Sequence, residues 1–310
     1  MTVKKDDQHL LVVTGVGGFI GSSIARRLFH DGYRIVGIDD FSTGDRNNVP
    51  SGIELVEADL AEVETAKFLP TRAHAVLHLA GQSSGEASFD DPVADLEKNT
   101  VSTLRLIDYA IAAQAKRIVY ASSMSVYGQT PDSPVSEENS PQPLSCYGAS
   151  KASAESYLRI FSHRLPYVSM RMFNVYGPGQ DLENLRQGMV SIYLAQALSS
   201  RRILVKGSAK RYRDFVYIDD VVEAWVRVLH REGPLNKALN IGTGVRTEVG
   251  ALLEKIQRLI PDTKVEFIDG TPGDQFGIYA NTSRMKKWLE MDSTITLDEG
   301  LRRFISQVST

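Results

Sequence analysis

A tyrosine and a lysine four positions apart, Tyr147 and Lys151, could form an acid–base pair. Residues with this spacing lie on the same face of a helix, so the two side chains can meet. A phenol has a pKa of about 10 and is almost fully protonated at neutral pH. A nearby ammonium group favours the phenolate, so we expect Lys151 to lower the pKa of Tyr147. Such a phenolate could take a proton from a substrate hydroxyl while the adjacent carbon loses a hydride.

Two serines, Ser122 and Ser123, end the strand that we expect at 117–123. In an open parallel sheet, the carboxyl ends of the strands face the ligand crevice. A serine hydroxyl there could hold the same substrate oxygen as Tyr147. The alternative is a solvated helical Tyr/Lys pair without a catalytic role, and the rest of the chain must distinguish the two.

A glycine-rich loop follows the first expected strand (10–15) and opens an amphipathic helix. In the spacing Gly15, Gly18 and Gly21, the first glycine permits a tight turn and the second lets a pyrophosphate approach the backbone. The third glycine lets the helix pack close to the strand, and free N–H groups at the helix start face the anion. The pattern predicts a dinucleotide site.

The second expected strand (33–39) ends in Asp39. A carboxylate at this place suits an adenosine ribose with free hydroxyls and would repel a 2′-phosphate. We therefore expect NAD rather than NADP as the cofactor.

The elements that must position these residues alternate along the first half of the chain. Strands separated by helices imply right-handed βαβ units and a parallel sheet, so the fold class is α/β, a Rossmann-type doubly wound sheet over residues 1–175. The further strands are expected at 53–60, 75–81, 117–123 and 167–175, and the helices at 19–31, 91–114 and from about Cys146 to His163.

We expect the second half, residues 176–310, to form a smaller C-terminal α/β lobe that binds the substrate, with some exchange of chain between this lobe and residues 1–175. A proline-rich stretch at 129–144 is expected to be a surface loop. Helical patterns occur at 188–199, 220–231, 247–260 and 296–307, and short strands at 203–206, 214–218, 237–241 and 264–268.

The composition excludes several classes of protein. A net charge of −3 argues against a nucleic-acid partner. The single cysteine, Cys146, cannot form an internal disulfide, which fits a reducing cytoplasm. The charged N-terminus lacks the apolar region of a signal peptide, and no apolar run approaches the ~20 residues of a membrane span. The scattered histidines show no metal-ligand spacing, and we expect His78 to be a hydrogen-bonded core residue rather than a base.

An ordered set of motifs resembles the extended short-chain dehydrogenase/reductases, in particular the NAD-dependent nucleotide-sugar epimerases and dehydratases such as UDP-glucose 4-epimerase. The resemblance covers nearly the whole chain. Its motifs include TGVGGFIGS (14–22), HLAG (78–81), SSMSVYG (122–128), YGASK (147–151), RMFNVYGPG (171–179), RDFVYIDDVV (213–222), LNIGTG (239–244) and TPGD (271–274).

The resemblance implies catalytic roles for Ser123, Tyr147 and Lys151, and it implies that Asn174 and Arg213 hold a substrate diphosphate beside Ser123. The implied substrate is a nucleotide-diphosphate sugar, with a UDP-sugar favoured. The implied partner is a second copy, joined through helices at about 91–114 and 148–163. The implied NAD contacts are Gly15, Gly18, Phe19, Ile20, Gly21, Asp39, Asp59, Leu60, Leu79, Ala80, Gly81, Asn99, Ser122, Tyr147, Lys151 and Phe173.

The chain departs from the family pattern at two places. Family dehydratases commonly carry Asp-Glu where this chain has Met124-Ser125, and without those carboxyl groups elimination is hard, which favours epimerisation or plain oxidation. From the resemblance we expect 4-epimerisation through a transient 4-keto intermediate. Thr271 replaces a frequent arginine, so a diphosphate contact is expected to be missing. A nucleotide-sugar dehydratase or net oxidoreductase on the same site, and a non-catalytic NAD-binding regulator, remain as alternatives.

Overall fold

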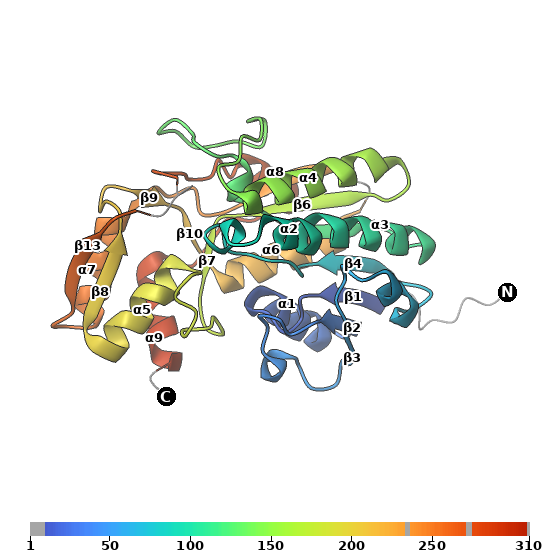
Figure 1. Cartoon of the computed structure of the whole chain (residues 1–310), viewed down its shortest axis with the longest axis horizontal. Helices are drawn as coiled ribbons and strands as arrows, with labels where there is room; N and C mark the ends of the chain where they lie inside the picture. The colour runs from blue at the N-terminus through green and yellow to red at the C-terminus, as the bar shows by residue number, and fades with distance from the viewer. Residues whose placement is uncertain (1–9, 233–235, 271–274, 309–310) are drawn as a thin grey trace.

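A seven-stranded sheet forms the centre of the computed structural model, which describes residues 10–232, 236–270 and 275–308 (Figure 1). Every neighbouring pair of strands in this sheet is parallel, which confirms the predicted α/β doubly wound fold. The order β11-β6-β5-β4-β1-β2-β3 uses β1 (Leu10–Thr14), β2 (Arg34–Asp39), β3 (Glu54–Glu57), β4 (Ala75–His78), β5 (Ile118–Ser123), β6 (Tyr167–Met172) and β11 (Lys237–Ile241).

The strand order reverses between β1 and β4. The chain runs outward from β1 to β3 and then returns to β4 on the other side of β1. Connections on the two sides diverge at this point and leave a crevice outside the carboxyl ends of the strands. The glycine loop after β1 and the turn at 79–81 after β4 therefore meet at one edge of the sheet.

Both faces of the sheet are buried, because its central strands are apolar on alternate sides. In β1, Leu11 and Val13 face one core, and Leu10 and Val12 face the other. Helices α1 (Phe19–His30) and α6 (Ile218–His230) cover the first face, and α3 (Ser102–Ala112) and α4 (Cys146–Ile160) cover the second (Figure 1).

The helix predicted at 91–114 is interrupted. It begins as α2 (Pro92–Leu96), capped by Asp91, whose Oδ1 accepts a hydrogen bond from the Ala94 N–H at 2.9 Å. A π turn at Glu97–Val101 follows before α3. Such turns are frequent at functional sites because the extra residue redirects side chains, here Lys98 and Asn99.

The single strand predicted at 167–175 is wrong in its last residues. Strand β6 ends at Met172, and β7 (Asn174–Tyr176) leaves the central sheet to pair with β10 (Phe215–Tyr217). Between them Phe173 is buried in a separate apolar cluster with Val126 and Ile278. The chain therefore passes from the central sheet to the sheet of β7 and β10 within the stretch predicted as one strand.

Several elements of the second half of the chain form a second group at the left of Figure 1, whereas α8 lies beside β11 of the central sheet. Strands β8 (Arg202–Lys206) and β13 (Lys264–Ile268) lie where strands were predicted, and they pair in parallel beside α5, α7 and α9. Strand β11, predicted with this group, instead adds to the central sheet beside β6. The division of the chain at residue 175 stays a prediction. The other elements are α5 (Met189–Ser200), β9 (Tyr212–Arg213), β12 (Thr247–Glu248), α7 (Val249–Leu259), α8 (Ser283–Leu289) and α9 (Leu297–Val308).

None of the helices within the described ranges combines the length and the apolar character that crossing a bilayer requires.

Candidate active site

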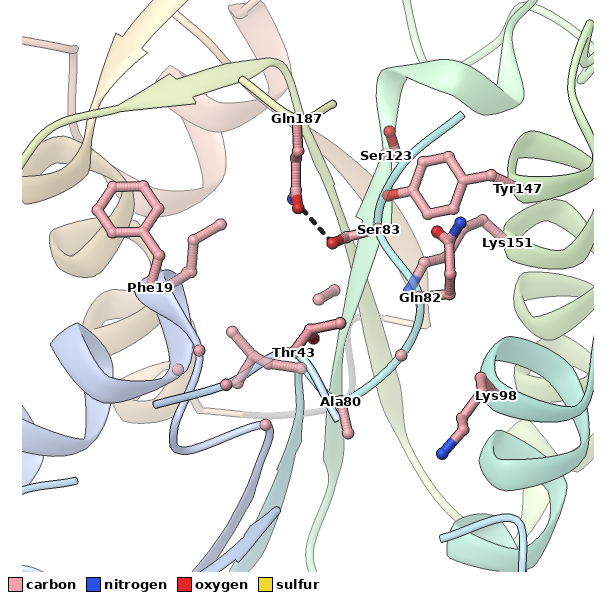
Figure 2. Close-up of a pocket in the computed structure, with 18 of the residues that line it drawn as sticks. Phe19, Thr43, Ala80, Gln82, Ser83, Lys98, Ser123, Tyr147, Lys151 and Gln187 are labelled. Carbon is pink, nitrogen blue, oxygen red and sulfur yellow. Dashed lines mark hydrogen bonds between the residues drawn. The ribbon is translucent and has the colours of Figure 1, made fainter. Parts of the chain in front are cut away.

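A cavity of about 570 Å³ opens at the carboxyl edge of β1, β4 and β5 (Figure 2). It brings together almost all of the residues predicted to bind the cofactor or the substrate, although Asn99, a predicted cofactor contact, and Arg213, a predicted substrate contact, are not in its wall. The predicted residues that line it are Gly15, Gly18, Phe19, Ile20, Gly21, Asp39, Asp59, Leu60, Leu79, Ala80, Gly81, Ser122, Ser123, Tyr147, Lys151, Phe173 and Asn174.

The glycine loop has the geometry that a pyrophosphate cradle requires. Gly15 adopts φ +70°, and a Cβ there would lie 2.7 Å from the Ala80 nitrogen, so the loop can approach the turn after β4 only with glycine. A Cβ on Gly21 would lie 2.0 Å from the Gly15 carbonyl oxygen, so α1 could not pack this close. Gly18 is the N-cap of α1 and offers no side chain to its N–H groups, which remain available to an anion.

Asp39 lies at the end of β2, where the sequence predicted a carboxylate that binds the adenosine ribose. It is 8% exposed, and its Oδ2 and Oδ1 accept hydrogen bonds from the N–H groups of Gly17 (2.8 Å) and Phe41 (2.9 Å). The carboxylate therefore holds the glycine loop while it lines the cavity. These contacts and the glycine geometry fit a dinucleotide with an unphosphorylated ribose.

Ser123, Tyr147 and Lys151 converge on one side of the cavity (Figure 2). Tyr147 is half-buried in the first turn of α4, and its phenol oxygen points into the cavity beside Ser123 (Figure 2). Lys151 is 3% exposed, and its Nζ lies 5.7 Å from the centre of the Tyr147 ring. The ring oxygen thus faces the crevice beside a serine and an ammonium group, as the spacing predicted.

The predicted lowering of the Tyr147 pKa is wrong in this structure. Burial raises the pKa of Tyr147 to about 12, the neighbouring Ser123 hydroxyl opposes this rise, and the charge of Asp95 adds to it. Burial also lowers the pKa of Lys151 to about 8. Desolvation is the largest contribution to both pKa shifts, because the Lys151 ammonium group is buried and the Tyr147 phenol lies in the cavity wall rather than in open solvent.

His78 is a core residue, as predicted. It is fully buried, its Nδ1 lies 2.9 Å from Thr14 Oγ1, and its Nε2 lies 3.0 Å from Thr103 Oγ1. Thr14 Oγ1 also accepts hydrogen bonds from the N–H groups of Leu79 and Ala80, each at 3.0 Å. His78 therefore helps to fix the turn at the cavity floor, and burial with the nearby charge of Lys151 lowers its pKa to about 3.

Two charged residues that line this cavity were not predicted from the sequence. Lys98, on the π turn, lines the cavity and forms ion pairs with Asp40 and Asp59, the latter at 2.8 Å. Asp95, on α2, lines it close to Lys151 and is 2% exposed. A carboxyl group on a predicted helix gives little signal by itself, and the π turn that redirects Lys98 has no simple sequence pattern.

A second cavity of about 510 Å³ adjoins the first, and both include Ser83, Met124 and Asn174 in their walls. Arg213 lines this second cavity and not the first. Its guanidinium donates to backbone carbonyl oxygens, including that of Gln275 at 2.8 Å. The predicted substrate residues Asn174 and Arg213 thus share the cavity that lies next to Tyr147, whereas Thr271 lies outside the described residues.

A set of polar contacts joins the two sides of the cleft above these cavities. Gln187 Nε2 donates to Ser83 Oγ at 2.7 Å (Figure 2), and Ser84 Oγ donates to the Arg186 carbonyl at 3.0 Å. Lys206 on β8 forms an ion pair of 2.8 Å with Glu86. The loop before α5 therefore covers the junction of the two cavities.

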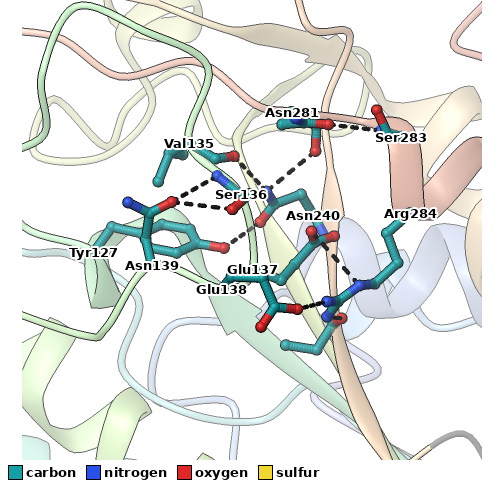
Figure 3. A network of polar contacts seen from close by, with 11 residues as sticks. Tyr127, Val135, Ser136, Glu137, Glu138, Asn139, Asn240, Asn281, Ser283 and Arg284 are labelled. Atoms are coloured by element: carbon teal, nitrogen blue, oxygen red, sulfur yellow. Dashed lines mark hydrogen bonds and ion pairs between the residues drawn. The ribbon is translucent and has the colours of Figure 1, made fainter.

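A polar network braces the turn that follows Ser123 (Figure 3). Tyr127 donates its hydroxyl to Asn240 Oδ1 at 2.5 Å, and Asn240 Nδ2 donates to the Val135 carbonyl at 2.8 Å. The backbone N–H of Asn240 donates to Glu137 at 2.8 Å, and Arg284 lies 3.8 Å from the same carboxylate. The predicted surface loop at 129–144 is thereby anchored to β11 and α8.

Comparisons with known proteins give a consistent result. The family described as "NAD dependent epimerase/dehydratase family" matches residues 11–242. The chain is 34% identical over 307 residues to UDP-glucose 4-epimerase of Mycolicibacterium smegmatis, covering 95% of this chain and 96% of that protein. The crystal structure of UDP-glucose 4-epimerase with UDP-glucose from Thermotoga maritima superimposes with a TM-score of 0.93 at 30% identity, covering 97% and 98% of the two chains. The NAD-dependent NDP-hexosamine 5,6-dehydratase TunA superimposes with a TM-score of 0.89 at 28% identity, again covering 97% and 98%.

Proposed function

We propose that this chain, which belongs to the NAD-dependent epimerase/dehydratase family, is a nucleotide-sugar 4-epimerase of the UDP-glucose/UDP-galactose type. Family membership makes the chain an enzyme with NAD as its cofactor. The observation that carries the proposal is the convergence of Ser123, Tyr147 and Lys151 on a dinucleotide cavity that adjoins a second cavity.

The residues of this site can perform a redox-neutral cycle. When bound, NAD⁺ supplies a hydride acceptor that carries a permanent positive charge, and such a charge lowers the pKa of a buried phenol. Tyr147 removes the O4 proton of the sugar as the C4 hydride departs, and Ser123 holds the same oxygen of the resulting 4-keto sugar. The sugar turns, the hydride returns to the opposite face of C4, and Tyr147 gives the proton back to O4. Lys151 stabilises the phenolate.

The two residues that follow Ser123 in the cavity wall, Met124 and Ser125, favour epimerisation over dehydration. Elimination of water needs an acid for the leaving hydroxyl and a base for the neighbouring carbon. Met124 and Ser125 line the junction of the two cavities, and neither is a carboxyl group. The structural similarity to TunA makes dehydration the second candidate.

The test is to supply the NAD-loaded protein with UDP-glucose and follow the sugar products by nuclear magnetic resonance. A 4-epimerase yields UDP-galactose and releases no free NADH. Accumulation of an unsaturated or deoxy-keto sugar would replace the proposal by the dehydratase alternative, and free NADH would indicate a net oxidoreductase. A thermal-shift panel of UDP-, dTDP-, GDP- and CDP-sugars identifies the preferred nucleotide, because a ligand stabilises the folded state that binds it.

Replacing Asp39 by asparagine is expected to weaken NAD binding by about 10- to 100-fold, since hydrogen bonds to a charged group contribute about 1.5–3 kcal/mol. The affinity for NADP is expected to fall less, because the repulsion of a 2′-phosphate is removed. Calorimetric titration of both cofactors measures the ratio. Asp31→Asn, at the surface end of α1 outside the cavity, is the control. An unchanged ratio in Asp39→Asn would contradict the ribose assignment.

We also propose a homodimer through α2, α3 and α4. Large apolar side chains are exposed on two of these helices, with Val93 65%, Leu96 47% and Ile160 60% exposed. Exposed apolar groups on neighbouring helices favour burial against a partner. Sedimentation at micromolar concentration tests this, and a stable monomer there would dismiss the dimer.

A further inference from the structure

Asp95 is a buried carboxylate in the wall of the cofactor cavity, and neutral groups hold it. Its Oδ2 accepts a hydrogen bond from Ser150 Oγ at 2.7 Å, and its Oδ1 accepts one from Asn99 Nδ2 at 3.1 Å. Within the described part of the chain, no lysine, arginine or histidine forms a direct ion pair with it. A buried charge of this kind is costly unless an opposite charge lies close by.

The opposite charge is Lys151, which follows Ser150 on α4, the helix against which α2 packs. Its ammonium group is buried, and Nζ lies 4.9 Å from the centre of the Tyr120 ring. A buried ammonium group needs an anion as much as a buried carboxylate needs a cation.

The other titratable or charged groups packed around Tyr147 and Lys151 do not fill this role. His78 on β4 and Tyr120 on β5 are buried and uncharged near neutral pH, because burial lowers the pKa of the first and raises that of the second. Glu155 on α4 is bound bidentately by Arg171. On the π turn, Lys98 is paired with Asp40 and Asp59. Asp95 is therefore the carboxylate that remains for Lys151.

We propose that Asp95 is the counter-charge of Lys151 and a positioning residue for the Tyr147–Lys151 pair, an inference that rests on the proposed function. The hydrogen bond from Asn99 Nδ2 contributes to the positioning, because it turns Asn99 Oδ1 away from the carboxylate and toward Gly81. A Cβ on Gly81 would lie 2.4 Å from Asn99 Oδ1 and 3.5 Å from Lys151 Nζ. Asp95 thereby directs a buried carbonyl oxygen, without a partner among the described residues, to the place where the lysine ends.

One negative charge acts on both members of the pair in the same direction. Asp95 raises the pKa of Lys151 against the effect of burial, and it raises the pKa of Tyr147. Removing the charge is expected to lower both pKa values. The phenolate then forms at lower pH, and the ammonium group is lost at lower pH.

The decisive variant is Asp95→Asn, tested as the NAD-loaded protein. Both limbs of the pH profile of kcat/KM for epimerisation are expected to move down by about half a pH unit to one unit. A second measurement does not depend on turnover. The near-ultraviolet absorbance of the Tyr147 phenolate, taken as the difference from a Tyr147→Phe background, is expected to appear at correspondingly lower pH.

Ser150→Ala is the matched control, because it removes one hydrogen bond to Asp95 and keeps the charge, so the phenolate midpoint is expected to stay at the wild-type pH. Asp95→Ser replaces Asp95→Asn if thermal unfolding shows that the asparagine variant does not fold. A wild-type midpoint in the variants without the charge, or an equal shift in Ser150→Ala, would overturn the proposal and leave Asp95 a packing residue. If the phenolate midpoint shifts in the Asp95 variants but the wild-type protein epimerises no sugar, the role of Asp95 as counter-charge is supported and the proposed function is refuted.

Discussion

Replacing Tyr147 by phenylalanine is expected to lower kcat by about 10³-fold, the range found when a positioned acid–base group is removed. The substitution deletes the oxygen that exchanges the substrate proton and leaves the ring in its place in α4. NAD binding is expected to persist, because the glycine loop and Asp39 remain. The measurement is the rate of UDP-galactose formation at saturating UDP-glucose, together with the NAD content of the purified variant.

Tyr157→Phe provides the control for this prediction. Tyr157 lies on the same helix, packs beside the core on the far side of the sheet from α1, and does not line the cavity. It is expected to keep wild-type turnover. If Tyr147→Phe also kept wild-type turnover, the mechanism would be wrong, and a non-catalytic NAD-binding regulator would become the better account.

Much of this fold follows from local patterns in the sequence. The apolar strand before Gly15, the helix after it and the carboxylate ending the next strand predict a βαβ unit that binds a dinucleotide, and the structure has this unit. The boundary at Phe173 could not be predicted, because a change of sheet within an apolar run depends on partners far along the chain. Phe173 packs with Ile278, and its N–H donates to the carbonyl oxygen of Ile241.

The grouping of most predicted site residues around one cavity followed from the sequence, whereas their electrostatics did not. Spacing alone places Tyr147 and Lys151 on one helical face. It does not say how deeply that face is buried, and burial decides the direction in which the pKa of each group moves. The anion that acts on both groups, Asp95, comes from a helix more than fifty residues earlier in the chain, so its role emerges only from packing.

The same face of α4 continues to Glu155, two turns beyond Tyr147, and there a buried ion pair fixes the helix to the sheet. Glu155 accepts hydrogen bonds from Arg171 on β6 at 2.9 and 2.6 Å and from Ser122 Oγ on β5 at 2.5 Å. The side chains of the ion pair are only 11% and 6% exposed. The residue predicted to contact the cofactor, Ser122, thus also holds the carboxylate that anchors the helix carrying Tyr147 and Lys151.

Replacing Arg171 by methionine is expected to destabilise the protein by about 3–5 kcal/mol, because it leaves the Glu155 carboxylate buried without its cation. Denaturant unfolding measures the loss. The double variant Glu155→Gln/Arg171→Met is expected to recover most of it, since no charge then remains in the interior. Arg258→Met, which breaks an exposed pair with Glu254 on α7, is expected to change the unfolding free energy very little. A double variant as unstable as Arg171→Met would show that packing of the guanidinium, and not its charge, holds α4 against the sheet.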